Sequence, residues 1–388
     1  MRILEVRETA IPVAAAMANA AIGFDEMTAS AVAVRTDRRV GGAPVIGYAL
    51  DSVGRYAHGG LLRERFIPRL EAAAEAEIAD PETGLLDPMR AWPVLMRNEK
   101  PGGHGERSAA VGVLDAALWD AAAKAARVPL WRLLADRFNG SGPDETVEIY
   151  ASGGHYRPDN PVDALAREVR DGMAQGFRTF KIKVAGAPPG IDRARIEAAL
   201  GAAGEGGRIA VDANAALDRE SLPRMAAVLA DYDLAWFEEP CDPLDFELTR
   251  EIAAAYPGPL ATGENLFSAA DARNLLRYGG LRKDRDLLQF DVSLSYGIPE
   301  YLRIVAAAER AGWSRRRLVP HAGHLFALNV VAGLGLGGHE IAPDATLVLG
   351  GLPDGWTVDD GKVAPGDLPG VGFEGKANAM AVLGALMG

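Results

Sequence analysis

Short apolar runs separated by turn residues open the chain. Runs at residues 3–6, 31–34 and 44–48, with Gly41-Gly42 between the last two, predict a small antiparallel sheet. Helical periodicity follows over residues 61–79 and 107–126. The second of these segments is apolar over most of its surface, so we expect that helix at an internal interface. Strands followed by helices predict an α+β unit over residues 1–140.

From about residue 145 the pattern changes to short apolar strands that alternate with amphipathic helices. The predicted strands are Val147–Gly153, Thr179–Val184, Ile209–Ala213, Ala235–Glu239, Ala261–Glu264, Leu287–Val292 and Leu318–His321, with a weaker one at Gly338–Ile341. Helices are predicted at Pro161–Gln175, Arg193–Ala203, Ser221–Asp231 and Ile298–Ala311. Repeated β-then-α units over residues 141–349 predict a (β/α)8-type barrel, although a doubly wound open sheet would alternate in the same way. The turn-rich sequence after residue 350 leads to a last short helix, which we expect to return to the N-terminal unit.

Composition narrows the classes of protein that fit. A chain of 388 residues exceeds what one hydrophobic core usually supports, and 48% hydrophobic with 24% charged residues is typical of a soluble globular protein. Acidic residues outnumber basic ones by 53 to 41 and no basic patch stands out, so we expect no nucleic-acid partner. The single cysteine, Cys241, excludes an intrachain disulfide and a Cys-based zinc site. The start lacks a signal peptide's apolar core and no long apolar stretch exists, so we expect a cytoplasmic protein without a membrane span.

Titratable residues end one predicted strand after another. They lie 26 to 30 residues apart, about one βα unit each, and are Lys183, Asp212, Glu238, Glu264, Asp291 and His321. Residues with this spacing share one height on a barrel, the rim at the carboxyl ends of the strands, where active sites of this fold lie. Charged groups there are costly unless they are paired or bound to a metal.

Three carboxylates, Asp212, Glu238 and Glu264, come from adjacent predicted strands. Hard oxygen ligands without Cys or His suit an octahedral Mg2+ that keeps positions open for substrate oxygens. Each carboxylate taken singly could instead be a solvated loop residue or part of a salt bridge at the rim. The common spacing favours the metal site.

Lys181 and Lys183 lie two apart on a strand, so their side chains point to the same face. Two neighbouring ammonium groups lower each other's pKa, which predicts a general base near neutral pH. The alternative is a pair of surface lysines on an edge strand, and the apolar run around them argues against it. Asp291 and His321 form the second predicted pair. A carboxylate at one imidazole nitrogen fixes the tautomer and raises the histidine pKa, which makes His321 a second acid or base rather than a core histidine.

The chain resembles the mandelate racemase branch of the enolase superfamily. The residues that carry the resemblance are Lys181-x-Lys183, Asp212-Ala213-Asn214, Glu238-Glu239-Pro240, Gly263-Glu264, Asp291 and Pro320-His321. The resemblance implies a (β/α)7β modified TIM barrel under an α+β capping domain, built from residues 1–140 with residues 350–388 returning to it. It also implies Mg2+ bound by the three carboxylates and a first step that removes a proton next to a substrate carboxylate, with a Lys or His base.

Within that branch the chain looks most similar to the D-tartrate dehydratases. The similar segments are residues 98–107, 153–156, 320–324 and 367–376. This resemblance implies a hydro-lyase that converts D-tartrate to oxaloacetate and water, and a loop at Ala14–Met27 that helps to choose the substrate.

The corresponding roles are predicted as follows. Lys183 removes the α-proton, Lys181 stabilises the substrate carboxylate and holds down the pKa of Lys183, and His321, held by Asp291, protonates the departing hydroxyl. Asn214, Glu340 and Lys100 are predicted to contact the substrate, a small hydroxycarboxylate, and we expect a homo-oligomer. Three alternatives stay open: a dehydratase of another aldarate or aldonate, a racemase or epimerase of a 2-hydroxy acid, and a catalytically silent protein on the same fold.

Overall fold

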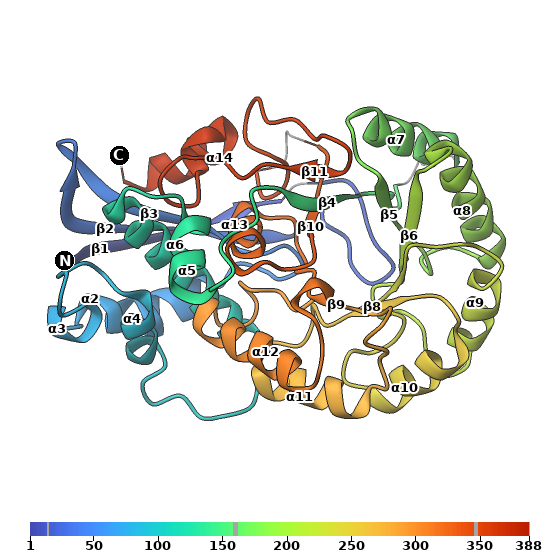
Figure 1. Cartoon of the computed structure of the whole chain (residues 1–388), viewed down its shortest axis with the longest axis horizontal. Coiled ribbons are helices and arrows are strands. Elements are labelled where there is room, and N and C mark those ends of the chain that lie inside the picture. Colours follow the sequence, from blue (N-terminus) through green and yellow to red (C-terminus); the bar gives the residue numbers. More distant parts are fainter. Residues whose placement is uncertain (14, 158–161, 345–347, 388) are drawn as a thin grey trace.

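A three-stranded antiparallel sheet forms the N-terminal part of the chain in the computed structural model, which describes residues 1–13, 15–157, 162–344 and 348–387 (Figure 1). The strands are β1 (Ile3–Pro12), β2 (Thr28–Val40) and β3 (Ala43–Leu50), in the order β1-β2-β3. Residues 29–34 of β2 are buried because helix α5 (Glu106–Ala126) packs on this sheet. A Cβ at Gly47 would lie 2.0 Å from the Ala117 carbonyl oxygen, so only glycine permits this close approach. The predicted antiparallel sheet is confirmed, and so is the predicted helix at an internal interface, which is apolar over most of its surface.

The helical segment predicted at residues 61–79 is broken into short pieces. They are α1 (Gly59–Leu61), a π turn (Leu62–Phe66), α2 (Ile67–Glu71) and α3 (Glu75–Ile78). Pro68 lacks the N–H that a regular α-helix would bond to the Glu64 carbonyl, and the irregular turn precedes it. Helices α4 (Pro88–Leu95) and α6 (Leu130–Phe138) flank α5 and complete this part of the fold.

The rest of the chain forms a curled parallel sheet with helices on its outside (Figure 1). In spatial order the strands are β10 (His339–Ile341), β4 (Val147–Ser152), β5 (Thr179–Lys183), β6 (Arg208–Asp212), β7 (Phe237–Glu238), β8 (Leu260–Thr262) and β9 (Leu287–Leu288). The helices are α7 (Val162–Ala174), α8 (Pro189–Ala203), α9 (Ser221–Leu229), α10 (Phe246–Ala255), α11 (Ala269–Tyr278), α12 (Ile298–Arg310) and α13 (Leu325–Leu334). Pro161, where one helix was predicted to begin, lies outside the described residues. The barrel fold with its cap is confirmed.

The predicted strand Leu318–His321 contributes only a bridge between Leu318 and Leu288. The chain leaves extended geometry directly afterwards, with φ of 88° at Ala322 and 64° at Gly323. Leu318 lies between β9 and the residues just before β10, because the Val319 N–H donates to the Leu288 carbonyl at 2.9 Å and the Gly337 N–H donates to the Leu318 carbonyl at 2.8 Å.

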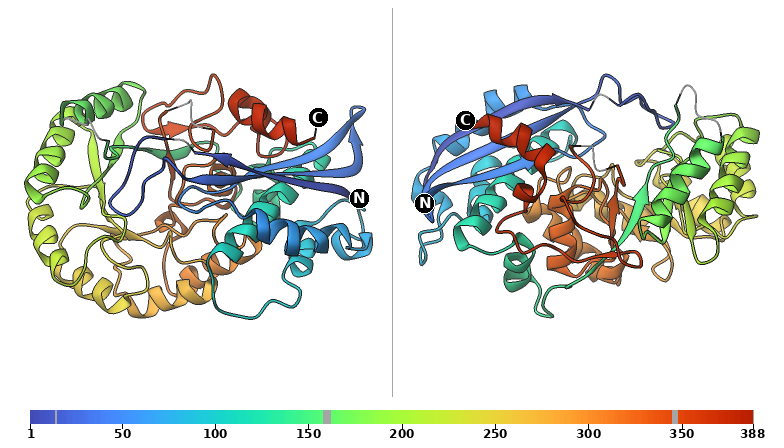
Figure 2. Two further views of the ribbon diagram at one scale, coloured as in Figure 1. Left: turned by 180° about the vertical axis from the view of Figure 1, so that it is seen from behind. Right: turned by 90° about the horizontal axis from the view of Figure 1, so that it is seen from above.

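The C-terminal tail returns to the N-terminal sheet, as the pattern predicts (Figure 2). A short strand, β11 (Lys362–Val363), first pairs antiparallel with β4. Helix α14 (Ala377–Leu383) then lies against β2. Arg7 and Arg35 donate hydrogen bonds to the carbonyl oxygens of Leu386 and Met387 at 3.0 and 2.9 Å. The division into residues 1–140 and 141–349 stays a prediction. Over the described segments, no helix combines the length and the apolar character needed to cross a membrane.

Candidate active site

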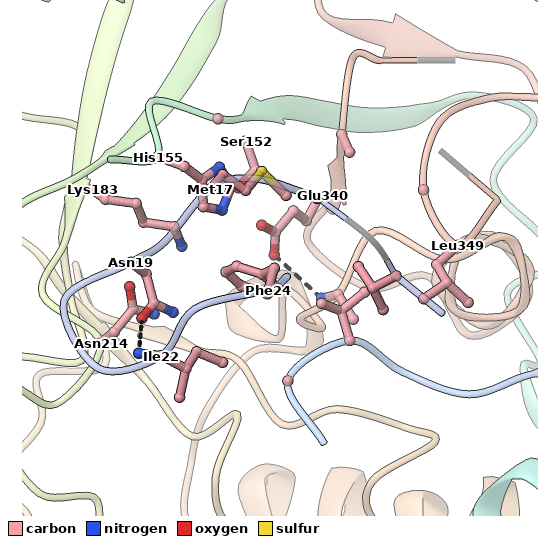
Figure 3. A pocket seen from close by; sticks show the side chains of 18 of the residues that line it. Met17, Asn19, Ile22, Phe24, Ser152, His155, Lys183, Asn214, Glu340 and Leu349 are labelled. Atoms are coloured by element: carbon pink, nitrogen blue, oxygen red, sulfur yellow. Dashed lines mark hydrogen bonds between the residues drawn. The ribbon is translucent and has the colours of Figure 1, made fainter. Parts of the chain in front are cut away.

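A cavity of about 600 Å³ opens at the carboxyl ends of the barrel strands (Figure 3). The predicted site residues that line it are Lys183, Asn214, Glu264, His321 and Glu340. Lys181, Asp212 and Asp291 are buried in contact with these residues, and the buried Glu238 contacts Lys181. The structure therefore brings nine of the predicted residues together.

Lys100 lies elsewhere. It is not among the described residues that line the cavity, and its carbonyl accepts a hydrogen bond from Arg107 in the cap. The cationic side chains from outside the barrel floor that do line the cavity are those of Arg55 and Arg157.

Lys181 is held among carboxylates. Its Nζ contacts Glu238 Oε1 and lies 3.1 Å from Glu340 Oε1 and 3.6 Å from Asp212 Oδ2. Burial alone would lower the pKa of Lys181, but the charges of Glu238 and Glu340 raise it well above its ordinary value. The expectation that the two lysines lower each other's pKa is therefore wrong for Lys181, because acidic neighbours dominate its surroundings.

Lys183 and Asp212 are partners across neighbouring strands. They are paired in register between β5 and β6, and Lys183 Nζ donates to Asp212 Oδ2 at 2.6 Å. Asn214 donates to the same carboxylate through its backbone N–H at 2.8 Å and its amide at 3.1 Å, and this geometry places Asn214 at φ 45°. Burial would raise the pKa of Asp212, but the ammonium groups of Lys183 and Lys181 bring it below its ordinary value. Asp212 therefore stays ionised.

Two glutamates next to each other have raised pKa values. Burial, with the nearby charges of Asp212, Glu340 and Glu264, raises the pKa of Glu238 to about 7, against the lowering effect of Lys181. Burial and the charge of Glu264 raise the pKa of Glu239 well above its ordinary value. Glu239 is held by the Asn265 amide at 2.9 Å and has φ 38°, a strained conformation of the kind found at functional sites.

The donor set fits a cation. Crowded, buried carboxylates with raised pKa values are a site that positive charge would stabilise. Glu264 Oε2 accepts no hydrogen bond from any residue that the structure describes. Within the same described ranges no three or more His, Cys, Asp or Glu side chains stand together as a ready metal cluster. Lys181 and Lys183 instead contact Glu238 and Asp212.

His321 pairs with Asp291 as predicted. Its Nδ1 lies 3.1 Å from Asp291 Oδ2, and its Nε2 lies 3.7 Å from Glu264 Oε2. Burial would lower the pKa of His321, but Glu264 and Asp291 raise it to about 10. The imidazole is thus protonated at neutral pH. Asp291 Oδ1 accepts the backbone N–H groups of Ser293 and Leu294 at 2.7 and 2.9 Å, and these bonds keep the carboxylate in place.

Glu340 joins the lysine side of the site to the histidine side. Its Oε2 accepts the Ala322 N–H at 3.2 Å and the Tyr150 hydroxyl at 3.4 Å. Burial would raise its pKa, but the charges of Lys181, His321 and Lys183 bring it far below its ordinary value. Glu340 therefore contributes a fixed negative charge at the end of β10.

A loop of the cap covers the cavity. The backbones of Ala18 and Tyr156 exchange two hydrogen bonds, at 2.8 and 2.7 Å, which join this loop to the segment after β4. The rings of Phe24 and His155 meet edge to face at 5.5 Å. The loop residues around the cavity are mostly apolar, among them Met17, Ile22 and Phe24 (Figure 3). The expected loop Ala14–Met27 is thus placed over the mouth, except for Ala14, which is outside the described residues; its role in choosing the substrate stays a prediction.

Sequence reasoning missed several residues of this site. Glu239 and Asn265 directly follow predicted ligands, and His155 lies in a segment that carried the family resemblance, so each had a signal that went unused. Burial and the charge of Lys183 lower the pKa of His155 to about 3, which keeps it neutral. Gln289, which donates to Glu238 Oε2 at 2.7 Å, lies two residues before Asp291 on the same predicted strand, so it too had a signal that went unused.

Comparison with known proteins places the chain in a family. Residues 164–379, more than half of the chain, match the family described as enolase C-terminal domain-like. The chain belongs to the enolase superfamily.

Curated members of the superfamily that resemble this chain include enzymes of sugar acids. L-talarate/galactarate dehydratase of Salmonella typhimurium is 34% identical over 237 residues, which is 61% of this chain and 55% of that protein. 3,6-anhydro-alpha-L-galactonate cycloisomerase of Streptomyces coelicolor is 31% identical over 282 residues, 70% of each chain. The chain thus spans little more than half of the first of these relatives.

Solved structures of the superfamily match nearly the whole chain. A racemase from Streptomyces coelicolor with bound magnesium has a TM-score of 0.78 at 27% identity and covers 99% of both chains. L-talarate dehydratase from Polaromonas, in complex with Mg and L-glucarate, has a TM-score of 0.75 at 26% identity, covering 96% of this chain and 94% of the other.

Proposed function

We propose that this member of the enolase superfamily is a Mg2+-dependent hydro-lyase that dehydrates a sugar acid. One observation carries the proposal: a single cavity is lined by the amine of Lys183, by the imidazole of His321 and by the carboxylate of Glu264. A base and an acid at one cavity are what a β-elimination of water requires. Relatives named as dehydratases of talarate and galactarate, arabinonate and galactonate support the same reaction class.

The proton transfers follow from the positions of these side chains. Lys183 takes the proton from the carbon next to the substrate carboxylate, and the electrons of that C–H bond form the enolate. Lys183 Nζ donates to Asp212 Oδ2 as an ammonium, so it releases one proton to solvent and leaves this carboxylate before its amine acts as base. His321 gives its Nε2 proton to the β-hydroxyl oxygen as the C–O bond breaks. Water departs, and the enol product becomes a 2-keto acid.

Other residues hold the charges in place. Lys181 stabilises the substrate carboxylate, and Asp291 keeps the His321 ring in position through Nδ1. Asn214 and Glu340 are the proposed polar contacts of the substrate near the reacting carbon. A carboxylate at the far end of a diacid would meet Arg55 or Arg157, which line the cavity, rather than Lys100.

The residues that would hold Mg2+ are Asp212, Glu238 and Glu264. When bound, the ion supplies positive charge beside the substrate carboxylate and so stabilises the negative charge of the enolate.

The substrate is the finer part of the proposal. D-tartrate, with oxaloacetate as product, is the substrate that the sequence resemblance suggests. The relatives act on longer acids, and a cavity of about 600 Å³ has room for six-carbon diacids as well. Racemisation of a 2-hydroxy acid is the second candidate, because the structural relative with bound magnesium is described as a racemase and because Lys183 and His321 are two proton carriers.

Product analysis tests these proposals. The purified enzyme is incubated with each tartrate stereoisomer and with a panel of aldarates and aldonates, with Mg2+ or with excess chelator. We expect a keto acid from at least one substrate with Mg2+ and none with chelator. An isomer without keto acid would replace dehydration by racemisation. If no substrate forms keto acid or exchanges its α-proton with solvent, the proposed function is wrong.

A further inference from the structure

Two buried carboxylate–histidine pairs lie on either side of the boundary between cap and barrel. In the barrel, Asp291 holds His321. In the cap, Asp51 follows β3 directly, and its Oδ2 lies 2.8 Å from His58 Nε2. Both aspartates are fully buried, with 0% of their surface exposed.

Ser52 connects the two pairs. Its hydroxyl donates to Asp291 Oδ2 at 2.6 Å, and its backbone N–H donates to Asp51 Oδ1 at 2.8 Å. Ser52 is itself 0% exposed, so water has no access with which to replace either bond. Ser52 of the cap thus donates one hydrogen bond to each of the two buried carboxylates.

The Ser52 hydroxyl bonds to Asp291 Oδ2, the same oxygen that pairs with His321. Asp291 Oδ2 receives only His321 and Ser52 as hydrogen-bond partners among the described residues, while Oδ1 receives two backbone N–H groups. The backbone bonds hold Oδ1, which also lies 3.8 Å from His324 Nε2, and the Ser52 hydroxyl shares Oδ2 with His321. Without that hydroxyl, Oδ2 loses its second partner in a site that excludes water, and the bond with His321 Nδ1 is left as the only one on that oxygen, which changes how the ring is held.

We propose that Ser52 is a positioning residue for the His321–Asp291 dyad, supplied by the cap to the acid of the barrel. The barrel alone provides His321 and Asp291, and the cap must be docked for the ring to be held at the angle that proton donation requires. The inference rests on the proposed function only where dehydration is the readout.

The test separates the two proton transfers. Ser52→Ala removes the hydroxyl, and Ser52→Cys keeps the size of the side chain but replaces the hydroxyl by a weak donor. Ser295→Ala is the matched control, since Ser295 is also 0% exposed and its hydroxyl bonds to no described residue. For each protein, deuterium exchange at the substrate α-carbon and keto-acid formation are measured in parallel.

In both Ser52 variants we expect keto-acid formation to fall on the order of 10- to 100-fold, as for other groups that orient a functional histidine. We expect α-proton exchange, which depends on Lys183, to stay within about twofold of wild type, and Ser295→Ala to change neither rate. If both rates fall equally, or if neither falls, the proposal is wrong.

A substrate-free measurement keeps this test independent of the proposed function. The proton on His321 Nδ1 is followed by NMR at low field and assigned by its absence in His321→Asn. A shift or loss of this signal in both Ser52 variants, with no change in Ser295→Ala, supports the proposal even if no substrate is found. An unchanged signal in the Ser52 variants overturns it.

Discussion

The pH dependence of stability should reveal the buried His58–Asp51 pair of the cap. His58 Nε2 lies 2.8 Å from Asp51 Oδ2 and His58 Nδ1 lies 3.1 Å from Glu106 Oε2, while only 1% of the histidine side chain is exposed. Burial would lower the pKa of His58, but the bonds to Asp51 and Glu106 raise it to about 9. Burial also raises the pKa of Asp51, so the pair as a whole holds its proton tightly.

The size of the effect follows from linkage between protonation and folding. The pKa of histidine in the unfolded chain is about 6.5, so the folded protein holds this proton about 2.5 units more tightly. At about 1.36 kcal/mol per unit, the bound proton contributes about 3 kcal/mol to the free energy of unfolding. Because the folded pKa is the higher one, this contribution is fully present below about pH 6.5 and is lost as the pH rises through about 9.

Thermal unfolding of wild type and His58→Gln measures this contribution. Glutamine keeps a donor for Asp51 but carries no titrating charge. With an unfolding entropy of about 2.1 cal/mol/K per residue, about 3 kcal/mol corresponds to a difference in Tm of about 4 °C for this chain. We expect the Tm of wild type, relative to that of the variant, to be higher near pH 6 than near pH 9.5 by about that much. Other groups that titrate in this range, such as Lys376 with a pKa of about 8, are present in both proteins and cancel. Parallel Tm curves over the whole range would refute the reasoning.

Three further variants test the site and its packing. Lys183→Ala should abolish deuterium exchange at the substrate α-carbon, and exchange at the wild-type rate would remove Lys183 as the base. His321→Asn should stop keto-acid formation while exchange continues; surviving dehydration would place the acid elsewhere. Gly112→Ala puts a Cβ 1.7 Å from the Ser293 carbonyl oxygen, so overpacking should cost about 1–3 kcal/mol, visible as a lower Tm. Gly140→Ala, with no atom within 4 Å of its added Cβ, should leave Tm unchanged, and equal Tm values for the two glycine variants would contradict this packing argument.

The spacing of polar residues predicted the site well because strand ends of a barrel lie at one level. Asp212 and Glu238 are paired in register between β6 and β7, and Lys183 and Asp212 between β5 and β6. Periodicity located β5 and β6 almost to the residue, because an apolar strand that is buried on both faces gives a continuous apolar run in the sequence.

Features that depend on three-dimensional surroundings could not be predicted in this way. The pKa of Lys181 depends on carboxylates from three other strands, of which one, Glu340, is far away in sequence. Ser52 gave no signal at all, because its partner Asp291 lies 239 residues further along the chain. Local pattern also failed at the predicted strand Leu318–His321, which forms only a bridge before the turn at Ala322, and where Pro68 interrupts a periodic segment.

The hydrogen bonds that join the cap loop to the barrel do not depend on which side chains the loop carries. The loop's two hydrogen bonds to the segment after β4 join the main-chain groups of Ala18 and Tyr156, and beside them the ring of Phe24 contacts that of His155. Every amino acid except proline supplies those main-chain groups, so the two hydrogen bonds allow other side chains at Met17 and Ile22, whereas a replacement of Phe24 removes its ring contact with His155. Side chains of the loop that line the cavity can therefore change one at a time while the main-chain bonds between loop and barrel stay the same.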